Sequence, residues 1–221
     1  MEKKSDSNTA SFLNSATPLS MSMQSYVATS QIVKNKNVLD IGCGQGFLAK
    51  RCLDVGAQNV YGIDISADAI QRARKNFGIN CMQADINDHE KVMEFAPSLD
   101  VLLCNAAQIP LPYPLPNGYF MGTDGRKMMD DALLFTNKYI QKYPKAQLIM
   151  TNTNLSNWEL TIQICKDMGL MAEVIPNTEL TFPIYKELIN NEEVLNHFRK
   201  VTNTLMEEKA IRGTLLRIYK A

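Results

Sequence analysis

Glycine and aspartate residues gather at the ends of three short apolar segments, in a pattern that suits binding of a nucleotide-like ligand. The first group directly follows an apolar run and comprises Asp40, Gly42, Gly44 and Gly46. Glycines where a strand passes into a helix leave the backbone free of side chains, so that a ligand can approach it closely. Phe47 occupies the place where a dinucleotide-binding turn has its last glycine, which argues against NAD or FAD.

An aspartate also closes each of the next two apolar runs. Asp64 follows Gly46 at about the distance where a carboxylate can accept hydrogen bonds from both hydroxyls of a ribose. Asp85 is placed to accept a hydrogen bond from an adenine amino group, with Ile86 against the ring. Either aspartate alone is typical of a helix cap or a turn. Three such segments in succession instead favour one ligand that contains an adenosine.

The apolar periodicity around these residues alternates between strand-like and helix-like stretches. Strands are expected at residues 38–41, 60–63, 80–84, 100–104, 147–151, 170–174 and 213–219. Amphipathic helices are expected at residues 47–55, 67–77, 90–95, 125–142 and 158–168. This alternation predicts an α/β fold of Rossmann-like type, with a seven-stranded, mostly parallel sheet covered by helices on both faces. Parallel strands end at one edge of a sheet, so the three polar segments should meet there.

The chain is expected to form one folded unit with two additions. Residues 1–20 are polar and lack periodicity, and we expect them to form a tail or a loosely held cap. Residues 21–221 are expected to form a single domain. Within it, residues 184–210 predict a charged helical insertion before the last strand, which is long for a simple connection and could close over the site as a lid.

Composition narrows the classes of function. The 221 residues are 45% hydrophobic and 21% charged, which fits a globular protein and excludes a disordered or collagen-like chain. Lysine plus arginine and aspartate plus glutamate both number 23, so no net positive charge indicates a nucleic-acid partner. No apolar stretch is long enough for a transmembrane helix, and the N-terminus lacks the apolar core of a secretory signal. We therefore expect a cytoplasmic protein without membrane contact.

Cysteine and histidine give no sign of a disulfide framework or a metal site. The five cysteines are scattered and form no C-x-x-C pair, as expected for reduced thiols. His89 and His197 lie among charged residues, and neither has another histidine or a cysteine at metal-ligand spacing. We therefore expect no bound metal.

With these segments in place, the sequence resembles the class I S-adenosylmethionine-dependent methyltransferases over residues 30–221. Residues 40–46 match the family's nucleotide loop, Asp64 its ribose-binding acid and Asp85 its adenine contact. The resemblance implies S-adenosyl-L-methionine as the cofactor, S-adenosyl-L-homocysteine as the product, and a last strand inserted antiparallel beside the fifth. The cofactor-binding residues that it implies are Asp40, Gly42, Gly44, Gly46, Asp64, Ile65, Asp85 and Ile86.

The fourth expected strand is followed by Asn105-Ala106-Ala107-Gln108, which resembles the Asn-Pro-Pro-Tyr signature of enzymes that methylate glutamine amides or adenine amino groups. Residues 122–126, Gly-Thr-Asp-Gly-Arg, resemble a segment that opens the next helix in the glutamine branch. Asn105 is then the expected catalytic residue, since its side-chain oxygen can orient an acceptor nitrogen. Two alanines replace the prolines that stiffen the loop, and Gln108 replaces the aromatic residue that would stack on a planar base.

These departures count against a nucleobase and favour a more polar acceptor. The residues expected to line the acceptor pocket are Gln108, Tyr113, Tyr119, Phe120 and Arg126. The aromatic residues could equally pin their loop to the core, and Arg126 could pair with a nearby acid instead of a substrate carboxylate.

We expect a monomer or homodimer that N-methylates a small polar metabolite or natural-product intermediate. Three alternatives stay open at this point. The first is methylation of a protein glutamine or an RNA base. The second is methylation of a small molecule on oxygen, which would need a general base. The third is a cofactor-binding module without catalysis.

Overall fold

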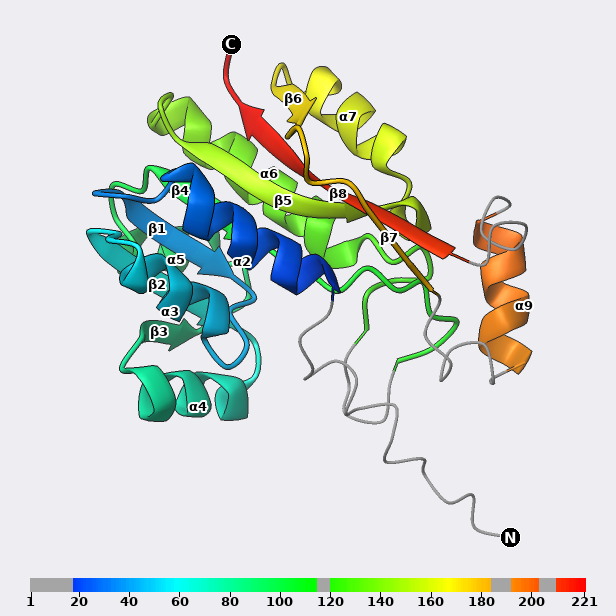
Figure 1. Ribbon diagram of the computed structural model, residues 1–221, viewed down its shortest axis with the longest axis horizontal. Coiled ribbons are helices and arrows are strands. Elements are labelled where there is room, and N and C mark those ends of the chain that lie inside the picture. The colour runs from blue at the N-terminus through cyan, green and yellow to red at the C-terminus, as the bar shows by residue number, and fades with distance from the viewer. Residues whose placement is uncertain (1–17, 115–119, 184–191, 203–209) are drawn as a thin grey trace, which may run out of the picture.

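The computed structural model describes residues 18–114, 120–183, 192–202 and 210–221, and these build a sheet between two layers of helices (Figure 1). The strands are β1 (Asn37–Ile41), β2 (Asn59–Asp64), β3 (Asn80–Gln83), β4 (Val101–Cys104), β5 (Gln147–Thr153), β6 (Met171–Val174), β7 (Leu180–Pro183) and β8 (Ala210–Tyr219). Their order is β3-β2-β1-β4-β5-β8-β6, with β7 also paired to β8. The first five strands are parallel and β8 is antiparallel to its neighbours. The predicted fold class is confirmed.

Helices cover both faces of this sheet. One face carries α2 (Pro18–Ser30), α3 (Phe47–Asp54) and α4 (Ala67–Phe77), and the other carries α5 (His89–Phe95), α6 (Lys127–Lys142) and α7 (Trp158–Asp167). Successive strand residues point to opposite faces, so Val38 joins the core under the first set of helices and Leu39 the core under the second. The central strands β1, β4 and β5 are therefore buried on both sides, as their short continuous apolar runs predict.

The register of the parallel strands decides which residues meet at the carboxyl edge of the sheet. Ile41, the last residue of β1, is paired with β2 on one side and with β4 on the other. The residues that come next, Gly42, Asp64 and Asn105, therefore emerge side by side. The chain order reverses at β1, with β2 and β3 to one side and β4 and β5 to the other. Open α/β sheets bind ligands at such a switch point.

The prediction of seven strands missed β7, and the described residues form eight. Residues 171–183 run along one side of β8 in two pieces, with β6 against residues 216–219 and β7 against residues 210–213. Asn177, with a φ of 63°, lies between the pieces. β8 is ten residues long and has room for both. β7 is a four-residue strand ending in proline, which makes its sequence pattern weak.

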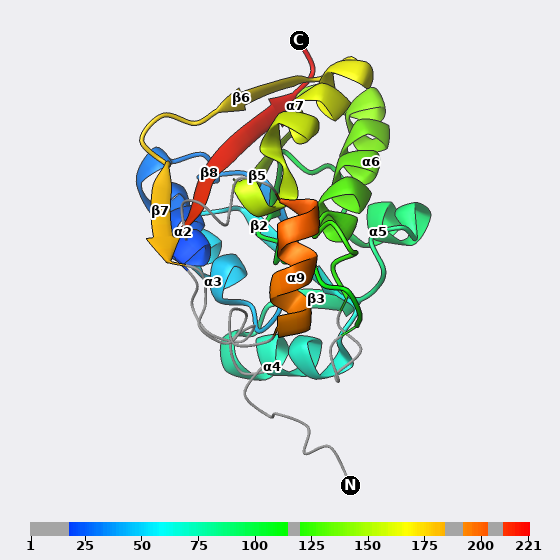
Figure 2. The same ribbon diagram turned by 90° about the vertical axis from the view of Figure 1, so that its right-hand side faces the viewer.

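The ends of the domain and the insertion are described in part. α2 begins at Pro18, before the position where the domain is predicted to start. α9 (Glu192–Val201) lies within the predicted helical insertion and outside the sheet, alongside the connection that leads to α6 (Figure 2). The rest of the insertion, at residues 184–191 and 203–209, and tail residues 1–17 lie outside the described residues. Closure of the insertion over the site stays a prediction.

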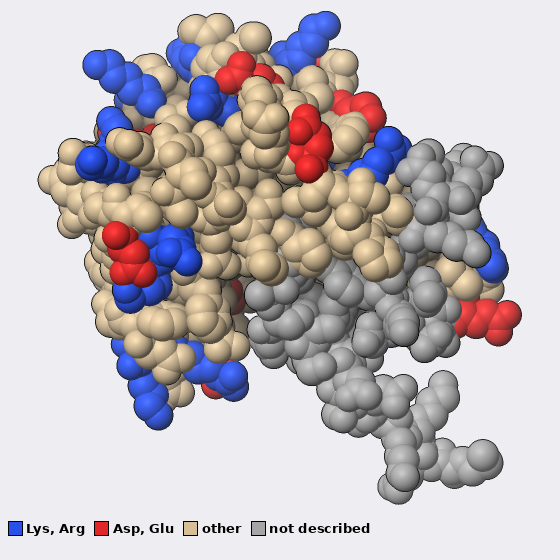
Figure 3. Space-filling view, viewed as in Figure 1, with Lys and Arg blue, Asp and Glu red and all other residues tan. Residues whose placement is uncertain are grey.

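The surface and the cysteines complete the description. Figure 3 shows lysine and arginine side chains interspersed with aspartate and glutamate over one face of the molecule. All five cysteines are buried, and burial raises the pKa of the Cys43, Cys52 and Cys104 thiols. No helix formed by the described residues combines the length and apolar character that a membrane span requires. Within the same residues, no three potential metal ligands come together.

Candidate functional site

The turn between β1 and α3 contains three glycines with left-handed backbone angles. Gly44 has a φ of +52°, and a side chain added there would meet no described atom within 4 Å, so the turn is open on that side. Gly46 has a φ of +86° and faces the core, where an added Cβ would lie 3.0 Å from the Cβ of Ala73. Only glycine adopts such angles without strain. One glycine thus leaves room for a ligand, and the other lets α3 pack close to α4.

Asp64 ties this turn to the end of β2. Its Oδ2 accepts a hydrogen bond from the backbone N–H of Gly44 at 2.9 Å, and its Oδ1 accepts one from the N–H of Ser66 at 2.8 Å. Each carboxylate oxygen can accept a second bond, so both hydroxyls of a ribose can still be bound. The backbone therefore fixes the carboxylate in place before any ligand arrives.

Asp40 lies beneath the turn and does not line the cavity described below. It is 2% exposed, and its carboxyl accepts a hydrogen bond from the N–H of Ala49 in the first turn of α3. α3 needs this partner because its cap residue, Gly46, has no side chain to offer. The Oδ2 of Asp40 has no partner among the described residues, and burial, with the charge of Asp64 nearby, raises the pKa of Asp40 to about 7. These contacts favour a role in building the turn over direct contact with a cofactor.

A cavity opens where β1, β2 and β3 end. Five of the predicted cofactor residues line it, namely Gly42, Asp64, Ile65, Asp85 and Ile86. Ile65 is 58% exposed, so its apolar surface is available to pack against a flat ring. Asp85 turns its Oδ1 to the backbone and side chain of Asn87, at 2.9 and 3.0 Å. Two carboxylates for hydroxyl and amino groups, together with two isoleucine side chains for a base, fit an adenosine.

The connection before α6 and the start of α6 supply further lining residues, which are Phe120, Met121, Lys127, Met128 and Asp131. Met128 packs on Gly42, and a Cβ added to Gly42 would lie 2.0 Å from the methyl carbon of Met128. Lys127 donates a hydrogen bond to Asp131 at 2.9 Å. Phe120 and Met121 belong to the loop whose large side chains the sequence predicts at a pocket, whereas Lys127, Met128 and Asp131 are not predicted. Opposite charges four residues apart at the start of a helix were the signal that could have pointed to Lys127 and Asp131.

Gln108 holds the loop that follows β4. Its side chain is buried, and its Nε2 donates to the carbonyl and hydroxyl oxygens of Thr151 at 2.6 and 3.1 Å. Its Oε1 accepts a hydrogen bond from the hydroxyl of Ser156 at 2.7 Å. Protein partners thus occupy the amide, which favours a role in positioning the loop over the predicted contact with the acceptor. Asn105, directly after β4, is half-buried at the start of this loop.

Arg126 also turns inward. Its guanidinium donates to the carbonyl of Ser156, to the carbonyl of Asn157 at 3.0 Å and to the hydroxyl of Thr161 at 3.1 Å. It pairs with Asp130 at 2.6 Å, and its side chain is 3% exposed. Of the two partners considered for Arg126, a substrate carboxylate and a nearby acid, the structure supplies the acid. Arg126 therefore links the start of α6 to the segment that follows β5.

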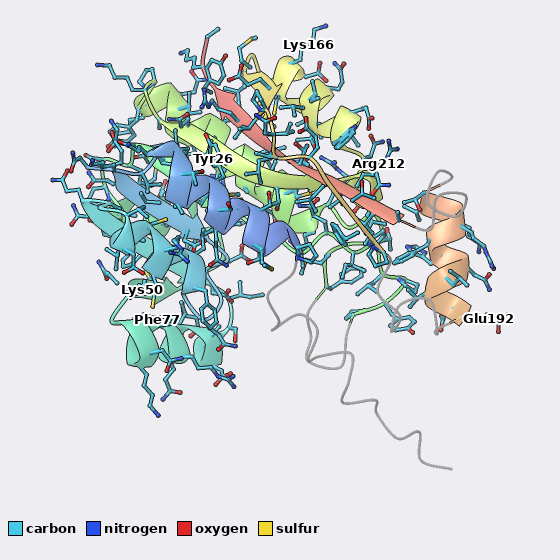
Figure 4. The ribbon with its side chains drawn as sticks, viewed as in Figure 1. Tyr26, Lys50, Phe77, Lys166, Glu192 and Arg212 are labelled. Carbon is cyan, nitrogen blue, oxygen red and sulfur yellow. The ribbon has the colours of Figure 1, made fainter. Side chains whose placement is uncertain are left out.

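The predicted aromatic residues of the acceptor side are placed unequally. Phe120 lines the cavity and Tyr113 is half-buried. Tyr119 lies outside the described residues. Phe47, which the sequence uses only as an argument against a dinucleotide, packs edge-on against Phe77, with 5.3 Å between ring centroids. Figure 4 labels Phe77 at the end of α4. Phe120 is therefore the predicted aromatic residue that meets the predicted cofactor residues.

α9 is attached to the connection that carries Phe120. Val194 and Phe198 of α9 belong to a small apolar cluster that includes Leu111, and Phe120 packs against this cluster. The Nε2 of His197 lies 2.6 Å from the carbonyl oxygen of Thr123, so the imidazole N–H donates. The helix thus borders the acceptor side of the site.

Comparison with known proteins agrees with this geometry. Residues 32–212 match the protein family described as a methyltransferase domain. Because the match spans most of the 221 residues, the chain belongs to that family.

Individual relatives are more distant. A putative protein N5-glutamine methyltransferase of Methanocaldococcus jannaschii is 26% identical over 156 residues, which span 68% of this chain and 78% of that protein. The ribosomal protein L11 methyltransferase of Shewanella baltica is 39% identical over 87 residues, which span 36% of this chain but only 27% of that protein. The structure of the E. cuniculi Mtq2–Trm112 complex, responsible for methylation of the eRF1 translation termination factor, superposes with a TM-score of 0.56. The superposition covers 91% of this chain and 94% of that one at 13% identity, which shows a shared fold alone.

Family membership and the cavity lead to the same cofactor. The carboxylates and apolar side chains at the ends of β2 and β3 are the groups that an adenosine requires, and the open glycine turn lies beside them. The methyltransferase family to which the chain belongs uses S-adenosyl-L-methionine as the methyl donor. The chain is accordingly an S-adenosylmethionine-dependent methyltransferase of the class I fold.

Proposed function

We propose that the cavity holds the adenosine of S-adenosyl-L-methionine and that the methyl group passes to a nitrogen atom beside Asn105. When bound, the cofactor supplies an electrophilic methyl group on a sulfonium. Asp64 would accept hydrogen bonds from the ribose, and Asp85 one from the adenine amino group. The observation that carries the proposal is the strand register, since Gly42 lies between Asp64 and Asn105. A ligand that extends from the cavity across the glycine turn therefore approaches Asn105.

Asn105 orients the acceptor in this proposal. Its side-chain oxygen and the carbonyl of Ala106 accept hydrogen bonds from the N–H groups of the acceptor, which directs the nitrogen lone pair at the methyl group. An amide nitrogen is a weak nucleophile, so alignment and exclusion of water supply most of the rate enhancement. Gln108 steadies the Ala106 carbonyl, because its Nε2 donates to that oxygen at 3.4 Å and to the carbonyl oxygen of Thr151 at 2.6 Å.

The acceptor that we propose first is the side-chain amide of a protein glutamine. The M. jannaschii relative, similar over 68% of this chain, carries the name of such an enzyme. The segment that begins with Asn105 resembles the same branch. The sequence-based reason for a more polar small acceptor was Gln108, and its amide is bonded to Thr151 and Ser156 instead.

A small polar molecule is the second candidate, because apolar side chains narrow the acceptor side. Phe120 and Met121 line the cavity together with Asp64 and Asp85. Phe120 is backed by the apolar cluster to which Phe198 of α9 belongs. A partly covered site of this kind favours an acceptor that can be enclosed.

An acceptor screen separates these candidates. The full chain is incubated with S-adenosyl-L-methionine and with pairs of peptides that differ only in glutamine or glutamate at one position. Small amines, amides and hydroxyl compounds are tested in parallel. We expect S-adenosyl-L-homocysteine to form, and one methyl group to appear by mass spectrometry, with the glutamine peptides alone. Methylation of small amines alone would support the second candidate. Methylation of hydroxyl compounds would overturn the choice of nitrogen, and binding of S-adenosyl-L-homocysteine without any turnover would support a non-catalytic module.

The role of Asn105 has its own test. Asn105→Ala should lower kcat by about 100-fold, because the acceptor loses its alignment, while the affinity for S-adenosyl-L-homocysteine stays unchanged. Asn137→Ala, at a half-buried position on α6, is the matched control. Full turnover in Asn105→Ala would overturn the orienting role.

A further inference from the structure

Lys127 lies in the cavity at a place that helix electrostatics disfavours. It is the first residue of α6, and the N-terminus of a helix is the positive end of its dipole, so a lysine there is destabilising. Arg126 precedes it and adds a second positive charge, although its guanidinium is buried against Asp130. An ion pair with Asp131, one turn along the helix, offsets part of this cost. Because both residues of the pair also line the cavity, Lys127 is a candidate for binding.

The ammonium group of Lys127 is held by a neighbour that also lines the cavity. Its Nζ donates to Oδ2 of Asp131 at 2.9 Å, and both residues line the cavity together with Asp85. The hydrogen bond to Asp131 and the charges of Asp131 and Asp85 raise the pKa of Lys127 despite partial desolvation. The side chain is therefore charged at neutral pH. An ammonium has three N–H donors, and Asp131 accepts from one of them, which leaves donors for a ligand.

Asp85 supplies a matching acceptor from a different element. Its Oδ1 receives both hydrogen bonds from Asn87, so the described hydrogen bonds leave Oδ2 for a ligand. The cavity thus combines a carboxylate that follows β3 with an ammonium at the start of α6. Adenine carries the complementary pair along one edge, where the 6-amino group donates and the adjacent N7 accepts.

We propose that Lys127 recognises the adenine base of the cofactor by donating a hydrogen bond to N7, while Asp85 accepts one from the 6-amino group. This inference rests on the proposed cofactor site and adds a residue from α6 to those at the strand ends. It explains why the Lys127–Asp131 pair faces the cavity. It also predicts that the protein distinguishes bases by N7 and not only by the 6-amino group.

Calorimetry with two ligands and two proteins tests the assignment. The ligands are S-adenosyl-L-homocysteine and its analogue in which N7 of adenine is replaced by C–H. The wild-type chain should bind the analogue about tenfold more weakly, because one hydrogen bond is lost. Lys127→Met should bind S-adenosyl-L-homocysteine about tenfold more weakly than the wild type and should bind both ligands equally well.

Folding does not confound this test, because Lys127→Met relieves an unfavourable charge at the N-terminus of α6 and breaks only a largely exposed ion pair with Asp131. Lys138→Met, an exposed position on the same helix, is the matched control and should keep the tenfold preference. Equal affinity of the wild type for both ligands, or an undiminished preference in Lys127→Met, would overturn the role of Lys127. A complete lack of S-adenosyl-L-homocysteine binding by the wild type would instead overturn the proposed cofactor site, and the assignment of Lys127 with it.

Discussion

The cofactor side and the acceptor side of this site are built in opposite ways. On the cofactor side, ligand-facing residues come directly from the ends of consecutive strands, and a backbone N–H of the glycine turn fixes the carboxylate of Asp64. On the acceptor side, side chains hold segments that are far apart in the chain. Gln108 reaches Thr151 and Ser156, 43 and 48 residues away, and His197 reaches Thr123, 74 residues away.

This difference shows that residue type alone does not separate a binding residue from a positioning one. Asp64 and Asp85 line the cavity, as their places at strand ends predict. Gln108 and Arg126 have equally suitable chemistry, yet both are buried and bonded to protein groups. A polar residue on the acceptor side is needed to join distant segments, and that need is visible only in three dimensions.

The largest expected effect concerns Asp40, the buried acid around which the cofactor side is built. Its carboxyl has a pKa of about 7 in the folded chain, against an ordinary value near 4, so the folded state binds more protons between these values. Raising the pH through this interval should therefore lower the stability of the wild type relative to Asp40→Asn by on the order of 4 kcal/mol in total. Urea unfolding of both proteins across the interval measures the difference. If the free energies of unfolding of the two proteins changed in parallel with pH, the turn would not enclose a protonated acid.

Asp64 should dominate cofactor affinity. Asp64→Ala removes the acceptor for the ribose hydroxyls and frees the N–H of Gly44, and we expect S-adenosyl-L-homocysteine to bind about 100-fold more weakly. Calorimetry checks this, with Asp68→Ala as a control because Asp68 forms an exposed ion pair with Arg72. Similar affinities in the two variants would contradict the role of the carboxylate at the end of β2 in holding the cofactor.

Arg126 tests whether a buried polar residue of the acceptor side acts in positioning and not in binding. Arg126→Met leaves the carbonyls of Ser156 and Asn157 without their donor, and should lower the free energy of unfolding by about 3 kcal/mol without changing cofactor affinity. Arg72→Met, which breaks an exposed pair, should change it by less than about 1 kcal/mol. If Arg126→Met were as stable as the wild type but impaired only in acceptor methylation, Arg126 would contact the acceptor, as the sequence predicts.

The smallest expected effect compares two glycines of one turn. Gly46→Ala forces a Cβ against Ala73 at a positive φ and should cost about 2 kcal/mol of stability, whereas Gly44→Ala meets open space and should cost about 1 kcal/mol. Gly44→Ala should nevertheless weaken S-adenosyl-L-homocysteine binding more, because its methyl group points to the open side of the turn. Thermal unfolding measures the loss of stability, which should be larger in Gly46→Ala, and calorimetry measures the loss of affinity, which should be larger in Gly44→Ala. If one variant lost more in both measurements, the two glycines would not have separate tasks.

Sequence patterns predict structure best where the determining contacts are local. Helix α4 begins and ends where its spacing predicts, because Ser66 caps one end and Gly78 terminates the other with a φ of 64°. The clustering of Gly42, Asp64 and Asp85 follows equally from strand ends that share one edge of a parallel sheet. Each of these inferences needs only the neighbouring residues and the general rules of α/β folds.

The features that sequence reasoning missed depend on partners far along the chain. Nothing near Gln108 indicates that Thr151 and Ser156 will enclose its amide. β7 exists because β8 is long enough to pair with a second short segment, and its own sequence has little strand character. Lys127 is an exception, because its partner Asp131 lies only four residues away. It was missed because a cation contradicts the usual charge preference of a helix start.

The position of β8 has a consequence for how the chain is made. β8 lies between β5 and β6, and neither β6 nor β7 has another strand partner in the described sheet. β5, β6 and β7 all precede β8 in the chain. During synthesis, the backbone groups that pair with β8 therefore stay unpaired until β8 has been made. Unpaired strand edges recruit other chains. A nascent polypeptide arrested before Ala210 should therefore be a substrate for chaperones, and its overproduction should yield aggregates.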